Sequence, residues 1–135
     1  PPPPALFPLP LALIAMDIDD FKPINDRHGH GVGDQTLVQV VECLESCIRP
    51  GDLLARWGGD EFMVVLPKSS LENARALAEN ICRTMRNMPI RDDLIVTLSL
   101  GVAERRMDES PAALMARADQ ALYRAKAAGK DGVSA

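Results

Sequence analysis

The stretch Arg56-Trp57-Gly58-Gly59-Asp60-Glu61-Phe62 sets two glycines and two acids between apolar runs. Residues 53–55 before it and 62–66 after it are rich in strand formers, which predicts a β-hairpin. Paired glycines permit positive φ angles and let another molecule approach the backbone, while the acids place carboxylates where the second strand begins. Taken alone, the stretch fits a solvated acidic turn as well as it fits a binding site.

The composition is that of one globular domain. The chain has 135 residues, of which 47% are hydrophobic and 25% charged, and this length buries a core without disulfides. A net charge of -4 argues against binding to nucleic acid. No apolar run approaches the roughly 18 residues that cross a bilayer, so we expect a cytoplasmic segment without membrane contact. Cys43, Cys47 and Cys82 lie in helical patterns and are expected to be reduced core thiols.

The order of the expected elements predicts the fold class. Residues 1–10 are proline-rich and are expected to form a lead or linker end, followed by one domain over 11–135. We expect buried strands at 11–16 and 94–103, helices at 34–48 and 71–85, and a last helix from 111 to about Gly129. Residues 21–33 suggest a short helix or turns and then a tight loop. The expected fold is an α/β (α+β) sandwich in which helices cover a mixed sheet containing the antiparallel hairpin.

Carboxylates follow or begin strands at two places in the sequence. Asp17 follows the first apolar run, and Asp60 and Glu61 begin the second strand of the hairpin. If these strands are neighbours, the carboxylates converge and need a compensating cation, for which Mg²⁺ carried by a nucleotide is suited. Two such ions would serve a phosphoryl or nucleotidyl transfer. The alternative is that these acids are simply polar strand ends.

Basic and amide side chains supply candidate partners for a nucleotide. Lys126 and Lys130 are four residues apart and would share a helix face that grips a polyphosphate, or else interact with the helix dipole. Lys22 and Arg56 are further basic candidates. Asn25 and Asp34 offer an amide and a carboxylate that match a guanine edge, although helix capping explains each equally well.

Together these residues resemble the GGDEF domains of diguanylate cyclases, from about Leu11 to Gly132. Five motifs occur in the order of that family: DIDDFKPIND at 17–26, GHGVGD at 29–34, RWGGDEF at 56–62, VTLSLGVA at 96–103, and ADQALYRAK at 118–126 followed by Gly129 and Lys130. The resemblance implies a nucleotide-cyclase and polymerase-palm-like fold. It also implies condensation of two GTP molecules into cyclic di-GMP with release of pyrophosphate.

The resemblance implies roles for individual residues. Asp17, Asp60 and Glu61 would be the catalytic acids, and the same three with the Ile18 carbonyl would bind two Mg²⁺ or Mn²⁺ ions with GTP. Substrate binding would fall to Lys22, Asn25, Asp34, Gly58, Gly59, Lys126 and Lys130. Each domain would hold one GTP, so catalysis would need a homodimer of half-sites.

The resemblance also implies regulation. Arg49-Pro50-Gly51-Asp52 resembles the product-binding RxxD motif of the family, so Arg49 and Asp52 would bind cyclic di-GMP as an inhibitor; the alternative is a turn that only ends the preceding helix. Family members usually carry an Asp-x-Leu-Thr-x-Leu-x-Asn-Arg turn and a helix before the first strand, where this chain has the proline run, so activity and stability of the isolated chain are open. We expect sensor or regulatory domains in the full protein. The rival interpretation is a module that binds GTP or cyclic di-GMP without turnover and signals through a partner.

Overall fold

The computed structural model describes residues 10–135, so most of the proline-rich lead expected at 1–10 lies outside the described residues. The elements are β1 (Leu11–Ile18), α1 (Phe21–His28), α2 (His30–Cys47), β2 (Leu53–Arg56), β3 (Glu61–Pro67), α3 (Leu71–Arg86), β4 (Leu98–Glu104), α4 (Pro111–Ala127) and β5 (Gly132–Ser134). None of the helices within residues 10–135 is long and apolar enough to cross a membrane.

The sheet has five strands in the order β2-β3-β1-β4-β5. β1 lies at the centre and pairs antiparallel with both β3 and β4, whereas β5 pairs parallel with β4. The expected hairpin is present, because β2 pairs antiparallel with β3 from Leu53 opposite Val65 to Arg56 opposite Phe62. The mixed sheet and its hairpin therefore confirm the predicted fold class.

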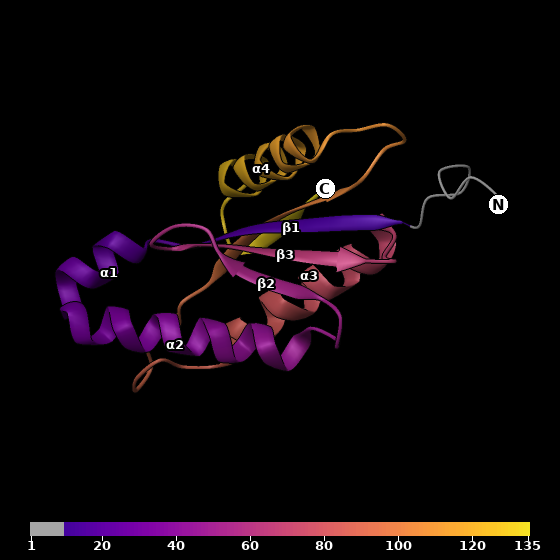
Figure 1. Ribbon diagram of the computed structural model, residues 1–135. Coiled ribbons are helices and arrows are strands. Elements are labelled where there is room, and N and C mark those ends of the chain that lie inside the picture. The colour runs from indigo at the N-terminus through magenta and orange to yellow at the C-terminus, as the bar shows by residue number, and fades with distance from the viewer. Residues whose placement is uncertain (1–9) are drawn as a thin grey trace.

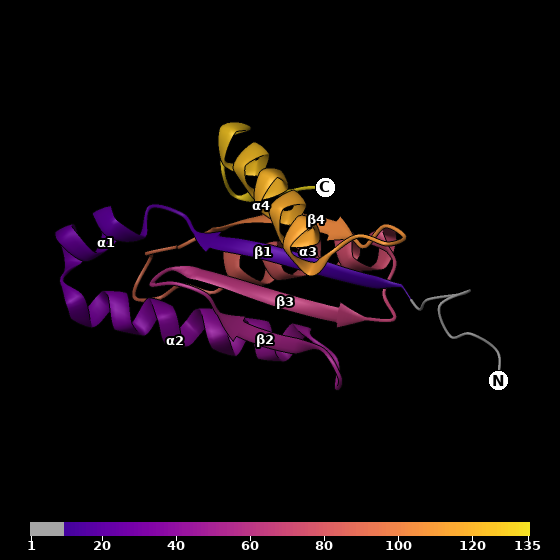
Figure 2. The same ribbon diagram turned by 45° about the horizontal axis from the view of Figure 1, so that its top comes forward.

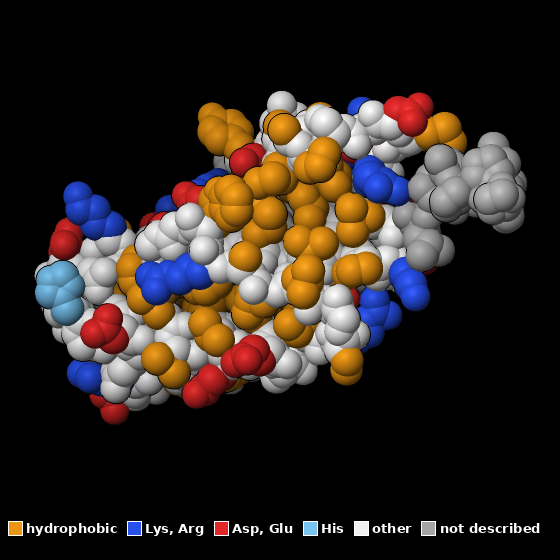
Figure 3. Space-filling model, in the orientation of Figure 1, with side chains coloured by type: hydrophobic (Ala, Val, Ile, Leu, Met, Phe, Trp, Pro, Cys, Tyr) orange, Lys and Arg blue, Asp and Glu red, His pale blue; other side chains and the backbone are white. Residues whose placement is uncertain are grey.

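Helices cover both faces of this sheet (Figures 1 and 2). The larger core lies between the sheet and α2 with α3, and includes Ile14, Met16 and Leu44, all fully buried. On the other face α4 packs on β4 and β1, where it forms a smaller cluster with Leu13 and Ala103. Hydrophobic side chains continue over the sheet between α4 and α2 in Figure 3.

Alternation explains how one central strand serves both cores. Side chains of successive residues in a strand point to opposite faces. In β1, Ile14 and Met16 accordingly belong to the larger cluster, and Leu13 and Ala15 to the smaller one. A strand buried on both faces has no polar alternation, which is why residues 11–16 form a continuous apolar run.

Two expected boundaries were wrong, and one strand was not expected. The helix expected from residue 34 begins at His30, because only Gly29 of the nearby glycines takes a positive φ angle, of 89°. The strand expected at 94–103 begins at Leu98, because Thr97 is engaged by Asp19 through both its carbonyl and its hydroxyl. The short strand β5 was not expected, since its residues 132–134 include a glycine and form only three pairs.

Candidate functional site

The predicted acids converge at one end of β1 and β3. The antiparallel register of these strands places Asp17 opposite Glu61, and the Ile18 amide donates to the Asp60 carbonyl at 3.0 Å. Carboxylate oxygens of Asp17, Asp60 and Glu61 all lie within 4.8 Å of one another. Asp17 is buried, Asp60 is half-buried and Glu61 is exposed, so the cluster opens to solvent on one side.

The turn of the hairpin holds the cluster in place. The amides of Trp57 and Gly58 donate to the Glu61 carbonyl at 2.8 and 3.3 Å. The Arg56 guanidinium donates to the carbonyls of Gly58 and Gly59 at 3.1 and 2.7 Å, so this arginine braces the turn from one side.

What distinguishes the two glycines of the turn is the lack of a side chain and not an unusual backbone conformation. Positive φ angles were suggested for them, but neither glycine has one. A Cβ atom at Gly59 would meet no atom within 4 Å, and one at Gly58 would make ordinary contact with Glu61. The observed backbone therefore does not demand glycine, and the open space above Gly59 is suited to the close approach of another molecule.

The two lysines pair with different aspartates, one from α4 and the other from the segment between α4 and β5. Lys126, in the last turn of α4, donates to Asp17 Oδ2, whereas Lys130 donates to Asp20 Oδ1 at 2.6 Å. The expectation of a shared helix face was wrong, because α4 ends at Ala127 and Lys130 has a φ angle of 64°. Burial, together with the charge of Lys130, lowers the pKa of Lys126, while the hydrogen bond to Asp20 raises the pKa of Lys130.

Asn25, in α1, packs against the start of α2. A Cβ atom at Gly33 would lie 1.7 Å from Asn25 Oδ1, so the side chain of Asn25 occupies the space that glycine leaves. Asn25 Oδ1 is buried and accepts no hydrogen bond in the structure. An unpaired buried acceptor costs about 1–3 kcal/mol, which is a cost associated with functional sites rather than with capping. Asp34 follows Gly33 and is exposed, as is Lys22 in the first turn of α1.

Asp19 is a residue of this region to which sequence reasoning assigned no role. Its carboxylate is buried and accepts hydrogen bonds from Ser99 Oγ at 2.6 Å, Thr97 Oγ1 at 2.7 Å and the Asp131 amide at 2.9 Å. It therefore ties the end of β1 to β4 and to the segment after α4. The alternating Thr97 and Ser99 in an apolar strand were the available sequence signal.

Arg49 and Asp52 lie at the opposite end of the hairpin. The Arg49 amide donates to Asp52 Oδ2 at 2.9 Å, and the Arg49 guanidinium donates to Ser69 Oγ at 2.8 Å. Asp52 directly precedes β2, where the register brings it opposite Leu66, and the five residues along β3 from there to Glu61 span about 17 Å at the usual rise of a strand. The two predicted sites are therefore separate places on the domain.

The residues of the acid cluster fit a divalent cation. Asp17 Oδ1 is buried and has no hydrogen-bond partner, although Lys126 contacts the other oxygen. Three carboxylates in one place repel one another, and hard oxygen ligands of this kind suit Mg²⁺ or Mn²⁺. Asp17, Asp60 and Glu61 can therefore hold a metal ion, whereas the Ile18 carbonyl remains a prediction.

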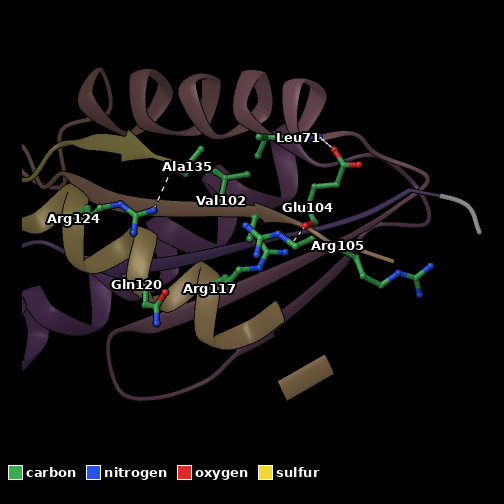
Figure 4. A pocket seen from close by; sticks show the side chains of 10 residues that line it. Leu71, Val102, Glu104, Arg105, Arg117, Gln120, Arg124 and Ala135 are labelled. Carbon is green, nitrogen blue, oxygen red and sulfur yellow. Dashed lines mark hydrogen bonds between the residues drawn. The ribbon is translucent and has the colours of Figure 1, made fainter. Parts of the chain in front are cut away.

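A separate cavity lies away from the acids, at the β4 edge between α3 and α4 (Figure 4). Its volume is about 470 Å³, and its lining includes Arg105, Arg106, Arg117 and Arg124. Arg117 is paired with Glu109 at 2.6 Å, and Arg124 donates to the Ala135 carbonyl at 3.2 Å. None of the predicted site residues lines this cavity.

Comparison with known proteins adds to this geometry. The family model described as "Diguanylate cyclase, GGDEF domain" matches residues 8–132. Diguanylate cyclase DgcM of Escherichia coli K12 is 44% identical over 124 residues, which are 92% of this chain and 30% of that protein. The chain therefore spans less than a third of the length of this relative.

Solved structures match the fold closely. The active GGEEF domain of a diguanylate cyclase from Vibrio cholerae superimposes with a TM-score of 0.89 at 36% identity, covering 93% of this chain and 82% of that one. The GGDEF domain of DgcB from Caulobacter crescentus, solved in complex with c-di-GMP, has a TM-score of 0.89 at 32% identity, covering 93% and 75%.

Proposed function

The chain belongs to the GGDEF domain family of diguanylate cyclases, and from this membership we propose that it condenses two GTP molecules into cyclic di-GMP and pyrophosphate. The observation that carries the proposal is the acid cluster, in which β1 and β3 bring Asp17, Asp60 and Glu61 within 4.8 Å. Since the relatives are longer than this chain, we include fusion to sensor or regulatory domains in the proposal, and a cytoplasmic location near the GTP pool.

The acid cluster would hold the metal. Asp17, Asp60 and Glu61, with the Ile18 carbonyl, are the proposed ligands of two Mg²⁺ or Mn²⁺ ions that accompany GTP. When bound, these ions supply positive charge against the negative charge that develops on the α-phosphate. Glu61, the exposed member of the cluster, is the proposed acceptor of the proton from the attacking 3′-hydroxyl.

The remaining predicted residues would bind and orient GTP. Lys22, Lys126 and Lys130 supply ammonium groups for the phosphates, and the open backbone at Gly58 and Gly59 leaves room for the nucleotide. The half-buried amide of Asn25 and the exposed carboxylate of Asp34 on the adjoining helix are the proposed partners of the polar groups on the guanine edge. Orientation of this kind supplies much of the catalysis in phosphoryl transfer.

One domain supplies half of the proposed reaction. The cluster holds acids for one nucleotide, and the reaction needs two 3′-hydroxyls attacking two α-phosphates. We therefore include in the proposal that two copies of the chain face each other, each presenting one bound GTP. A rate that rises with the square of protein concentration at low concentration would be the kinetic sign of this arrangement.

The test of this function is direct. Concentrated protein is incubated with GTP and Mg²⁺, and the nucleotides are separated. We expect cyclic di-GMP from the wild type and none from Asp17→Asn or Asp60→Ala, with Asp93→Ala as the control because Asp93 is an exposed acid of another loop. Near-normal synthesis by either cluster variant would refute the metal assignment. GTP binding without product would instead support a binding module.

Product inhibition at Arg49 and Asp52 is the second part of the proposal. The exposed guanidinium of Arg49 lies beside Asp52, about a strand's length from the acid cluster, so an inhibitor there would not overlap the substrate. We expect Arg49→Ala to synthesise product normally but to lose inhibition by added cyclic di-GMP. Unchanged inhibition in this variant would reject the assignment.

A further inference from the structure

The ion pair between Lys126 and Asp17 joins two elements that are far apart in the sequence. These residues are 109 positions apart in the sequence, at the end of α4 and at the end of β1. The side chain of Asp17 is 8% exposed, whereas that of Lys126 is 40% exposed. The lysine therefore reaches from the surface onto a buried carboxylate, and its tip can leave while Asp17 stays in place.

Asp17 belongs to a cluster that carries more negative charge than its contacts balance. Among the described residues, the ion pairs supply the cluster with one cation, which is Lys126, and Asp60 and Glu61 take part in none of these pairs. Asp17 Oδ1 is buried and has no hydrogen-bond partner. One ammonium group thus partly neutralises a site whose carboxylate oxygens lie close enough together to hold a cation of higher charge.

We propose that Lys126 competes with a divalent metal for Asp17, so that the metal must displace the ammonium group from this carboxylate to bind. This inference rests on the proposed function, because it concerns the same metal and the same nucleotide. A dication on Asp17 and an ammonium group on the same carboxylate repel each other at a few ångströms, so the two occupants compete. Lys126 therefore lowers the affinity of the site for a metal ion that is not accompanied by a nucleotide.

A polyphosphate resolves this competition. A triphosphate offers Lys126 oxygens that compete with Asp17 for its ammonium group, and the vacated carboxylate then binds metal more tightly. By linkage, bound metal strengthens the binding of the polyphosphate by the same factor. Lys126 therefore couples the binding of the two ligands, so that metal and nucleotide bind together and not one after the other.

Lys130 provides the matched control. Like Lys126 it pairs with an aspartate, in this case Asp20 at the start of α1, at 2.6 Å, and its side chain is 45% exposed. Its partner Asp20 is not one of the three clustered acids. Removing either lysine takes one positive charge from the same region, but only removal of Lys126 frees a carboxylate of the cluster.

The experiment measures Mn²⁺ binding without nucleotide, by electron paramagnetic resonance of the free ion. MnCl₂ is titrated into wild type, Lys126→Gln, Lys130→Gln and Asp17→Asn, and circular dichroism verifies that each variant is folded. We expect Lys126→Gln to bind Mn²⁺ about tenfold more tightly than wild type, within the usual range of coupling between sites. Lys130→Gln should change the affinity by less than about twofold, since long-range repulsion alone is screened by salt.

The outcomes separate this inference from the proposed function. If Lys126→Gln binds Mn²⁺ no more tightly than wild type, or if Lys130→Gln gains as much, the inference is overturned while the metal site stands. If Asp17→Asn retains wild-type binding, the metal assignment fails and the inference fails with it.

Discussion

Replacing Gly33 with alanine is expected to disable base recognition and leave the fold intact. Gly33 lies in α2, where alanine is favoured over glycine by about 0.8–1 kcal/mol. The new Cβ atom would lie 1.7 Å from Asn25 Oδ1 and 2.7 Å from Asn25 Cγ, so the Asn25 side chain must rotate away. Forcing a side chain off its rotamer costs about 0.5–1.5 kcal/mol, and the two terms nearly cancel in the free energy of unfolding.

The loss should instead appear in nucleotide binding. A good hydrogen-bonding contact to a base edge contributes about 1–3 kcal/mol of discrimination, which corresponds to about a 5- to 150-fold loss of affinity. The assay is calorimetric titration of a non-reacting GTP analogue. Gly31→Ala is the control, because Gly31 lies in the same helix and a Cβ atom there would meet nothing within 4 Å. Gly31→Ala should bind the analogue normally and gain stability.

A double-mutant cycle decides whether Gly33 acts through Asn25. In an Asn25→Ala background the obstacle to the new methyl group is gone, so Gly33→Ala should cost no further affinity. Additive losses would show that Gly33→Ala acts by another route. Full affinity for the analogue in the single Gly33→Ala variant would refute the positioning argument outright.

Three further predictions concern the folded state. A Cβ atom at Gly101 would lie 2.1 Å from a backbone nitrogen of α4, so Gly101→Ala should lower the free energy of unfolding in urea by about 3 kcal/mol; a loss under about 1 kcal/mol would contradict this packing. Hydrogen bonds from Arg117 lower the pKa of Glu109 to about 2, so this carboxylate stabilises the fold above its ordinary pKa and loses that effect as the pH falls toward 2. The difference in melting temperature between wild type and Glu109→Gln should accordingly be largest above pH 5 or so and shrink toward pH 2, whereas a gap independent of pH would count against it. Burial raises the pKa of Cys82 to about 12, so iodoacetamide at neutral pH should label the half-buried Cys47 first; equal labelling in the native protein would be inconsistent with that burial.

The sequence predicted that the acids lie at strand ends, and their convergence followed on the condition that these strands are neighbours. Asp17 follows a continuous apolar run, and Glu61 directly precedes another. The position of a side chain at a strand end is then set by which strands pair. Antiparallel pairing of β1 with β3 places these two residues opposite each other. Local patterning therefore predicted the strands and the acids at their ends, whereas the pairing of β1 with β3 that brings the acids together is a long-range feature that the structure supplies.

Contacts between side chains far apart in the sequence could not be predicted from local patterns. Lys126 was expected to bind phosphate, but its partner Asp17 depends on how α4 crosses the sheet. That crossing depends on the close approach of α4 to β4 at Gly101, a glycine in the middle of a strand that periodicity alone does not explain. The boundary of α2 was misjudged for a related reason, because Gly33 is needed for its neighbour Asn25 rather than for a loop.

The three acids around the end of β1 show how far residue type can determine function. Asp17, Asp19 and Asp20 occur within four positions, and composition does not distinguish them. The fold separates them: Asp17 joins the acids of the hairpin, Asp19 is buried against β4, and Asp20 is exposed beside Lys130. Asp19 therefore anchors the strand end on which Asp17 depends for its position. In the proposed exchange, Asp17 must keep its position when Lys126 leaves, and the hydrogen bonds of Asp19 hold the strand end that carries it. The structural role of Asp19 thus supports the proposed metal-binding role of Asp17.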